Sequence, residues 1–294
     1  MTLHHQSQVI SMRDNFACFI LCHGRPENTP TYDTLRKFGY TGKIYIICDD
    51  EDKTLPGYIE RYGKDSVKIF NKLEVLKNFD TMDTSDNRAC AVYARNACFT
   101  IARELGLKYF CELDDDYYNI RFRINKDGKL ITRYTYDMDS VFESYLEFLD
   151  CSPHIYSIAF SQTGDYIGGC NSNLARHQWL HKCMNSWICD VDKAFTFNGR
   201  MNDDVNTYTL GGSRGLMYFT LTGLCIDQPN TQQVSGGMTE MYKGEGTYQK
   251  SFYTVMQCPS FVSIDVMGDK YYRIHHHIDS KKGYPKIISG VYKK

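Results

Sequence analysis

Four carboxylates lie close together at the end of an apolar stretch of the sequence. Residues 108–113 read KYFCEL, and Glu112, Asp114, Asp115 and Asp116 fall at or directly after the end of this stretch. Like charges at this spacing repel each other, and ionised carboxylates leave water at a cost. Because Mg²⁺ and Mn²⁺ take oxygen ligands and offset such repulsion, the Asp114-x-Asp116 spacing can hold a divalent cation. The alternative is a surface turn whose acids cap helices and face water.

A metal at this place suits the transfer of a group from a nucleotide. A cation at the end of a strand can grip a diphosphate and neutralise the charge on a departing phosphate. The sequence contains neither the P-loop pattern GxxxxGK[ST] nor GxGxxG. Kinases, P-loop NTPases and dinucleotide dehydrogenases therefore lose support.

Basic residues gather in two stretches, although the whole chain is nearly neutral. The 294 residues include 34 basic and 35 acidic side chains, for a formal net charge of −1, which argues against a protein that coats nucleic acid. Residues 119–136 hold five basic side chains against one acidic, and residues 266–294 hold seven against two. Interleaved with aromatics, such stretches suit ligands that carry phosphate; a solvated surface is the alternative.

The first 120 residues alternate between strand and helix patterns. Short apolar runs predict four parallel strands covered on both faces, at 16–23, 43–48, 66–70 and 108–113. The intervening patterns predict helices at 31–39, 54–63 and 87–105. This order predicts an α/β fold with a Rossmann-like, mostly parallel sheet flanked by helices. The loops after the first, second and fourth strands should then converge on one crevice.

The second half of the chain is more mixed. Its patterns predict helices at 139–149 and 247–257 and strands at 155–160, 216–226 and 261–266. Two glycine-rich stretches, 164–173 and 209–215, are predicted to be turns or places of close backbone approach by a ligand. Because no linker or repeat separates the halves, we expect one domain over 1–294. Its nucleotide-binding half would be about 14–119, and its acceptor-binding half about 120–294.

The cysteine pattern and the hydropathy of the sequence indicate the cellular compartment. Twelve cysteines are scattered without a CxxC pair or a zinc pattern, and the polar start does not resemble a secretory leader. The longest apolar run, 16–22, is too short for a membrane span. We therefore expect reduced thiols, a cytoplasmic protein and no membrane partner.

Four motifs follow one another along the first half: FILCHGRP, GYTGKIYIICDDED, YARNACF and YFCELDDDY. With NDDV and RIHHHID…PKII further on, they resemble the TET-associated glycosyltransferases, a phage family with the A-type nucleotide-sugar glycosyltransferase fold (GT-A). The likeness is dense over 16–118 and thinner afterwards. It implies a metal-dependent enzyme that moves a sugar from a UDP-sugar to a hydroxymethylated pyrimidine, such as 5-hydroxymethylcytosine, in phage DNA. The location it implies is the cytoplasm of an infected bacterium.

The resemblance implies roles around the donor and its metal. Asp114 resembles the first acid of the DxD motif, which faces the ribose or sugar and lies at the metal. Asp116 resembles the acid that binds Mn²⁺ or Mg²⁺ directly, with Asp115 between them on the donor side. Arg95 resembles an arginine that approaches the donor sugar or diphosphate. Arg88, two turns earlier on the predicted helix, would project from the same face, and a solvated helix face is the alternative for both.

Two further loops resemble a nucleoside pocket. His23 and Arg25 resemble residues that line this pocket at the mouth of the first strand. Asp49 and Asp50 lie where such folds place a carboxylate that accepts from the uracil ring N–H. The alternative for these acids is a polar turn.

The motifs of the second half imply a base and the rest of the metal shell. Asp204, with Asp203 second, resembles the general base that removes the proton of the acceptor hydroxyl; a helix-capping loop is the alternative. A C-terminal histidine often completes the metal shell in this fold class. In an extended segment His275 and His277 face one way and His276 the other, so the side that meets the metal stays open, with the first two as the predicted ligands.

Lys282, with its basic neighbours, is placed to meet the diphosphate or the acceptor backbone, and a plain basic surface is the alternative.

Three other functions remain open. A transferase of the same fold can act on a glycan, lipid or protein, which the near-neutral net charge favours. A nucleotidyltransferase, which also uses paired carboxylates and a metal, would release pyrophosphate instead of UDP. A non-catalytic nucleotide-sugar or DNA-binding module would bind without hydrolysing the donor.

Overall fold

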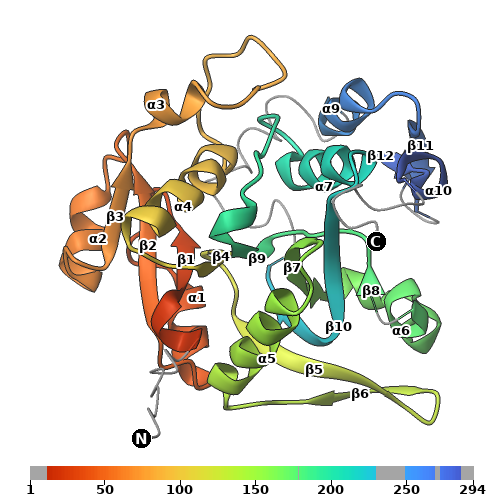
Figure 1. The fold of residues 1–294 in the computed structure, drawn as a ribbon, viewed down its shortest axis with the longest axis horizontal. Helices are drawn as coiled ribbons and strands as arrows, with labels where there is room; N and C mark the ends of the chain where they lie inside the picture. The colour runs from red at the N-terminus through yellow and green to blue at the C-terminus, as the bar shows by residue number, and fades with distance from the viewer. Residues whose placement is uncertain (1–11, 178, 230–248, 269–271, 286–294) are drawn as a thin grey trace, which may run out of the picture.

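A ten-stranded mixed sheet runs through the protein in the order β3-β2-β1-β4-β9-β7-β10-β5-β6, with β8 paired to β10 (Figure 1). A second, two-stranded sheet pairs β11 with β12. The computed structural model describes residues 12–177, 179–229, 249–268 and 272–285.

The N-terminal half supplies the parallel part of the large sheet. Its elements are η1 (Met12–Asn15), β1 (Phe16–Leu21), α1 (Pro30–Lys37), β2 (Lys43–Asp49), α2 (Leu55–Tyr62), β3 (Val67–Phe70), α3 (Lys72–Leu76), α4 (Val92–Glu104) and β4 (Tyr109–Asp114). The pairs β1–β2, β1–β4 and β2–β3 are all parallel. Every residue of β1 is buried, as expected for a strand covered on both faces. The predicted α/β fold and its four N-terminal strands are confirmed.

The second half extends the same sheet with mixed strand directions. Its elements are β5 (Asn119–Lys126), β6 (Lys129–Arg133), α5 (Met138–Asp150), β7 (Ile155–Gln162), η2 (Thr163–Tyr166), η3 (Gly169–Asn171), α6 (Asn173–His177), β8 (Trp179–Leu180), β9 (Ser186–Asp190), η4 (Val191–Lys193), α7 (Asp203–Ser213), β10 (Met217–Asp227), α9 (Gln249–Gln257), β11 (Val262–Met267), β12 (Arg273–Ile278) and α10 (Ser280–Gly283). Strand β9 pairs antiparallel with both β4 and β7, so it joins the halves into one sheet. The sequence-based prediction did not include the strands β5, β6, β8, β9 and β12 or the helices α3, α6, α7 and α10.

Helices cover both faces of the sheet. Alternate residues of β1 enter different cores, because side chains along a strand point to opposite faces. Cys18 and Ile20 pack in the core that α1, α2 and α5 cover, whereas Ala17 and Phe19 pack in the core that α4 and α7 cover. Figure 1 shows α4 and α7 above strands β4 and β9, and α5 below them.

The helix predicted over 87–105 begins later, at Val92. Before it, the Asn87 side chain accepts a hydrogen bond from the backbone N–H of Ala89, a local bond that competes with helix formation. Arg88 therefore lies outside α4, and its Nη2 pairs with Glu51 Oε1 at 2.7 Å. The expectation that Arg88 shares a helix face with Arg95 is wrong.

The glycine-rich stretch 209–215 is helical up to Ser213 instead of forming a turn. A Cβ atom at Gly211 would lie 2.6 Å from the ring of Tyr218, and one at Gly212 would lie 2.7 Å from the ring of Tyr284. These glycines let α7 pack closely against the protein's own aromatic rings. The stretch 164–173 forms two short 3-10 helices, η2 and η3, and the start of α6.

All twelve cysteines are free thiols, in agreement with the expectation of reduced cysteines. Among the helices of the described residues, none has both the length and the apolar character needed to cross a membrane.

Candidate active site

The loops after β1, β2 and β4 meet at the carboxyl edge of the parallel strands, as predicted. The backbone N–H of Gly24 donates to Asp52 Oδ2 at 2.9 Å, which joins the first two loops. Arg25 donates from Nε to Asp115 Oδ2 at 2.8 Å and from Nη2 to the other oxygen of the same carboxylate. This two-point ion pair ties the loop after β1 to the acidic cluster, and a paired guanidinium and carboxylate hold a defined geometry.

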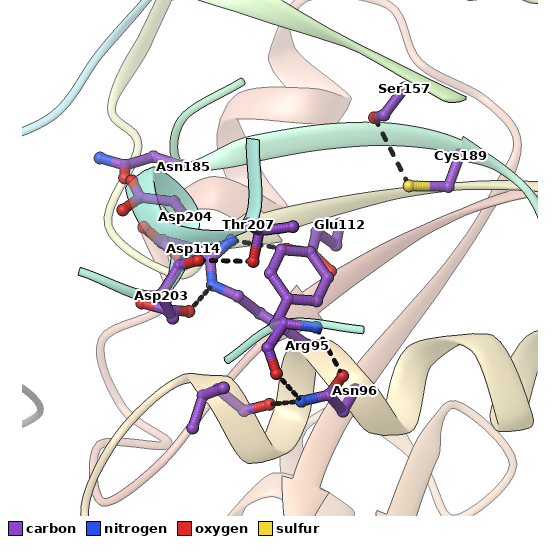
Figure 2. A network of polar contacts seen from close by, with 12 residues as sticks. Arg95, Asn96, Glu112, Asp114, Ser157, Asn185, Cys189, Asp203, Asp204 and Thr207 are labelled. Carbon is purple, nitrogen blue, oxygen red and sulfur yellow. Dashed lines mark hydrogen bonds and ion pairs between the residues drawn. The ribbon is translucent and has the colours of Figure 1, made fainter. Parts of the chain in front are cut away.

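A buried arginine lies at the centre of the acidic cluster. Figure 2 shows the Arg95 guanidinium between Glu112, Asp114 and Asp203. Its Nη1 lies 2.5 Å from Glu112 Oε1, its Nη2 3.3 Å from Asp114 Oδ1 and its Nε 2.8 Å from Asp203 Oδ2. The side chain of Arg95 is only 4% exposed, so these carboxylates supply the charge that a buried guanidinium requires. Arg95 thus links strand β4 to the start of α7.

Asp114 and Asp116 have raised pKa values. Burial raises the pKa of Asp114 to about 6, although Arg95 opposes the shift. Burial and the neighbouring Asp114 carboxylate raise the pKa of Asp116 to about 7. Asp116 Oδ1 is buried and has no hydrogen-bond partner within the described part of the chain. A buried carboxylate oxygen without a partner fits a position where a cation binds, because a cation supplies the missing interaction.

Asp203 and Asp204 occupy the first turn of α7, which begins after Asn202 in a left-handed conformation with φ 58°. Carboxylates are favoured there because the N-terminal end of a helix carries partial positive charge. Burial raises the pKa of Asp203 to about 7, with Arg95 opposing the shift and Asp204 adding to it. Asp204 Oδ1 accepts a hydrogen bond from the N–H of Val205 at 2.7 Å.

Glu112 is the site residue that sequence reasoning left without a role. It is fully buried on β4, and burial raises its pKa to about 8 although Arg95 lowers it. Its position, two residues before Asp114, puts both side chains on the same side of the strand. A charged residue in an otherwise apolar parallel strand is the signal that could have pointed to an ionic partner on the covering helix.

The carboxylates at the end of β2 and in the loop after it bond other groups of the protein. Asp49 Oδ2 lies 2.7 Å from His23 Nδ1, and Asp49 Oδ1 lies 3.0 Å from Nζ of the buried Lys72. Asp50 Oδ1 accepts from the backbone N–H of Lys72 at 3.0 Å, and its other oxygen bonds Asn71 Nδ2. Both oxygens of each predicted uracil acceptor, Asp49 and Asp50, thus have protein partners. His23, whose side chain is 44% exposed, presents its ring at the edge of this network.

The pairing of His23 predicts a pH-dependent term in stability. The hydrogen bond to Asp49 raises the pKa of His23 above 6.5 against the effect of burial; Asp52 also raises it and Lys72 lowers it. Because the folded-state pKa is raised, this stabilisation is complete below pH 6.5 and is lost as pH rises through the raised value. We expect His23→Gln to lower Tm at about pH 6 and to have little effect at about pH 8, with under about 1 kcal/mol lost because the ring is partly exposed. Thermal unfolding across this range measures the difference.

His177→Gln is the matched control, since His177 is exposed on α6 and its loss should leave the pH dependence unchanged. A fall in Tm that is the same at every pH in His23→Gln would contradict the pairing of His23 with Asp49.

The C-terminal sheet packs against the start of α7. Asn202 Nδ2 lies 3.0 Å from His276 Nδ1, and burial lowers the pKa of His276 to about 3. His275 Nδ1 contacts the backbone oxygen of His276 at 2.8 Å, and His277 is exposed. His276 therefore contacts Asn202, the residue directly before Asp203.

No three acidic, histidine or cysteine side chains of the described ranges gather closely enough to enclose a metal ion. The metal roles of His275 and His277 stay predictions. Lys282 is exposed on α10 and lies 3.4 Å from Asp279, and its predicted phosphate contact also stays a prediction. The PKII segment and the last basic residues, 286–294, lie outside the described residues.

Comparison with known proteins identifies the family of the chain. Residues 16–237 match the family model described as TET-Associated Glycosyltransferase. No curated protein matches the sequence.

Solved structures with a distant likeness include S. aureus TarS in complex with UDP, at 10% identity and TM-score 0.45 over 83% of this chain and 65% of that one. The mannosyltransferase PcManGT from Pyrobaculum calidifontis, in complex with GDP-Man and Mn²⁺, has 10% identity and a TM-score of 0.46 over 74% of this chain and 57% of that one. Glucosyl-3-phosphoglycerate synthase from Mycobacterium tuberculosis, in complex with Mg²⁺ and UDP, has 9% identity and a TM-score of 0.44 over 90% of this chain and 87% of that one.

An α/β sheet with an acidic cluster at its carboxyl edge, together with a family match over most of the chain, defines a glycosyltransferase of the GT-A type. Within that class, the chain belongs to the TET-associated glycosyltransferases.

Proposed function

We propose that this glycosyltransferase moves a sugar from a nucleotide donor, a UDP-sugar, to the hydroxyl of a 5-hydroxymethylpyrimidine in phage DNA, with a divalent cation. The observation that carries the metal-dependent part is the buried Oδ1 of Asp116, which lies among carboxylates and has no hydrogen-bond partner within the described ranges. The proposed acceptor follows from the family. The free thiols of all twelve cysteines support a reducing compartment such as the host cytoplasm.

Asp114 and Asp116 are the residues that would hold Mn²⁺ or Mg²⁺. Burial and neighbouring carboxylates raise the pKa values of both, so a cation would offset the cost of holding two ionised carboxylates there. Magnesium is commonly held by one or two carboxylates together with substrate phosphates, which fits a site with few protein ligands. When bound, the cation would offset negative charge on the leaving diphosphate. His275 and His277 are the proposed further ligands.

The first half, about 14–119, would bind the donor. His23 and Arg25 line the edge where the three loops meet, and Asp115 holds the Arg25 guanidinium in place. Asp49 and Asp50 would shape the nucleoside pocket through their bonds to His23 and Asn71. Arg88 and Lys282 are proposed to add positive charge near the diphosphate.

The second half, about 120–294, would bind the acceptor. Asp204 is the proposed general base, because it lies in the first turn of α7 next to Asp203, which is paired with Arg95. If the configuration at the sugar inverts, Asp204 would take the proton from the acceptor hydroxyl as its oxygen attacks the anomeric carbon. Asp203 is the second candidate. If the configuration is retained, the leaving phosphate would take that proton.

A transfer assay tests the proposed function. A panel of UDP-sugars is incubated with the full chain, Mn²⁺ and duplex DNA that contains 5-hydroxymethylcytosine. We expect the DNA to gain the mass of one sugar per modified base, with stoichiometric release of UDP. Asp204→Asn should reduce the rate by about 100-fold or more, as expected when a general base is lost.

The outcomes separate the competing functions. Transfer to a glycan, lipid or protein but not to hydroxymethylated DNA would identify the runner-up function, a transferase of the same fold with another acceptor. The near-neutral net charge is the observation that favours this alternative. Release of pyrophosphate would identify a nucleotidyltransferase, and donor binding without turnover would identify a binding module.

A further inference from the structure

Strands β5 and β6 form a two-stranded ribbon, residues 119–133, that extends to one side of the molecule (Figure 1). Among the described strands, β5 joins the ribbon to the rest of the sheet through β10, and β6 lies at the edge. The turn at its tip contains Asp127 and Gly128, both with positive φ, which is the conformation of a tight hairpin. The ribbon carries five basic residues and one acid.

One face of the ribbon is occupied by the protein itself. Arg121 Nη2 pairs with Asp227 Oδ1 at 2.8 Å, and the Arg123 guanidinium lies 5.5 Å from the centre of the Tyr166 ring. Leu130 packs against a small apolar cluster that contains Tyr166 and Leu174. This inner face is therefore a packing surface.

The opposite face is exposed along its outer half. The cross-strand pairs on this face are Phe122 with Arg133, Ile124 with Ile131 and Lys126 with Lys129. Phe122 packs on the main core at the root, whereas Ile124 is 42% exposed and Lys126, Lys129 and Arg133 are exposed. The outer face thus combines two isoleucines with three basic side chains. The only acid of the ribbon, Asp127, lies at the turn.

The root of the ribbon adjoins the acidic site. Strand β5 begins at Asn119, three residues after Asp116. The backbone N–H of Tyr118 donates to the backbone oxygen of Asp227 at 3.1 Å, and Asn119 Nδ2 donates to Asp227 Oδ2 at 2.9 Å. At about 3.4 Å per residue, β5 carries Lys126 roughly 24 Å from this anchored root.

We propose that the outer face of the ribbon binds duplex DNA, with Lys126, Lys129 and Arg133 meeting backbone phosphates. This inference rests on the proposed function, because it assigns a surface to the DNA acceptor. A two-stranded β-ribbon fits the major groove of B-DNA, and the substituent at C5 of a pyrimidine projects into that same groove. Ile124 and Ile131 suit contact with apolar base edges there, such as the thymine methyl group. A ribbon in the groove would leave its root, and with it Asp116, close to the acceptor base.

Charged residues on an edge strand also discourage pairing with a second chain, a role that needs no DNA. Binding of unmodified duplex DNA separates the two roles. We expect K126Q/K129Q, in the full chain, to bind a fluorescent duplex at least about tenfold more weakly than the wild type at about 0.1 M salt. The slope of log K against log salt should fall by about 2, one unit for each lost phosphate contact.

The matched control is K64Q/K68Q, which removes two positive charges at the β3 end of the sheet. It should bind DNA like the wild type, and both variants should keep the wild-type Tm. Equal DNA affinity for K126Q/K129Q and the wild type, or no duplex binding by the wild type, would overturn the proposal. So would a change in oligomeric state without a change in DNA affinity, which would assign the ribbon to an interface between copies.

The transfer assay keeps this inference distinct from the proposed function. If the wild type transfers sugar to hydroxymethylated DNA and K126Q/K129Q does so with an unchanged KM, only the ribbon assignment fails. If the wild type binds duplex DNA through the ribbon but transfers no sugar to hydroxymethylated DNA, only the proposed function fails.

Discussion

Asp116→Ala is expected to abolish metal-dependent turnover of the nucleotide sugar, a loss of at least about 100-fold in rate. The buried Oδ1 of Asp116 has no hydrogen-bond partner in the described structure, so the folded protein gains little from this carboxylate without a cation. Burial and the charge of Asp114 raise its pKa to about 7, which means that an ionised Asp116 is held against an electrostatic cost. Removal should therefore leave Tm unchanged or slightly higher.

Two measurements check this result. Release of UDP in the presence of Mn²⁺ reports the activity, and the rise in Tm on adding Mn²⁺ reports binding of the cation by mass action. Both should be lost in Asp116→Ala and kept in Asp65→Ala, which removes an exposed acid from the loop before β3. Wild-type turnover in Asp116→Ala would refute the metal assignment.

Arg95→Met is expected to destabilise the protein by about 3–5 kcal/mol, because it leaves buried carboxylates without their positive partner. Glu112 is fully buried, and Arg95 Nη1 lies 2.5 Å from its Oε1. Asp203, whose Oδ2 lies 2.8 Å from Arg95 Nε, also loses its pair. For a chain of this size the expected fall in Tm is about 6–15 °C. Activity should fall as well, since Arg95 links β4 to the helix that carries Asp204.

The size of this loss should depend on pH and on Glu112. Burial already raises the pKa of Glu112 to about 8, so without Arg95 the carboxyl takes up a proton and the destabilisation becomes smaller as pH falls. The double variant Arg95→Met/Glu112→Gln should recover part of the loss, with a coupling of about 1–3 kcal/mol.

Arg103→Met, on an exposed position of the same helix, is the control and should change stability by no more than about 0.5 kcal/mol. An Arg95→Met protein as stable as this control would show that the central ion pairs contribute nothing.

Local sequence patterns were sufficient for the strands that carry the three converging loops of the candidate site. The apolar runs before His23, Asp49 and Asp114 are strands buried on both faces, and this pattern is a property of each segment alone. Since parallel strands present their carboxyl ends at one edge, convergence of the three loops followed from the order of the elements. The pattern was less informative for α7, because this buried helix reads DDVNTYTLGGS, mostly polar or small residues, and so has no apolar stripe to reveal it.

Local sequence patterns could not predict two kinds of contact: side-chain hydrogen bonds that compete with helix formation, and bonds between residues that are far apart in the sequence. Arg88 falls outside α4 because the Asn87 side chain bonds the backbone locally, and it then pairs with Glu51, a residue of a different loop. The oxygens of Asp49 and Asp50 bond Lys72, His23 and Asn71, contacts that the sequence did not indicate, and their role at a nucleobase stays a prediction. These partners are distant in sequence, and no spacing rule relates them.

By itself, the sequence determined the class of fold, the family and the place of the acids at the end of a strand, because strand burial and local motifs are encoded in neighbouring residues. Only the tertiary structure decided how that charge is held. It placed Arg95 among Glu112, Asp114 and Asp203 and brought His276 to the start of α7. Among the residues that the structure describes, it also left one oxygen of Asp116 without a hydrogen-bond partner. The physical reason is that the energy of a buried charge depends on which charges fold against it, and those come from segments far apart along the chain.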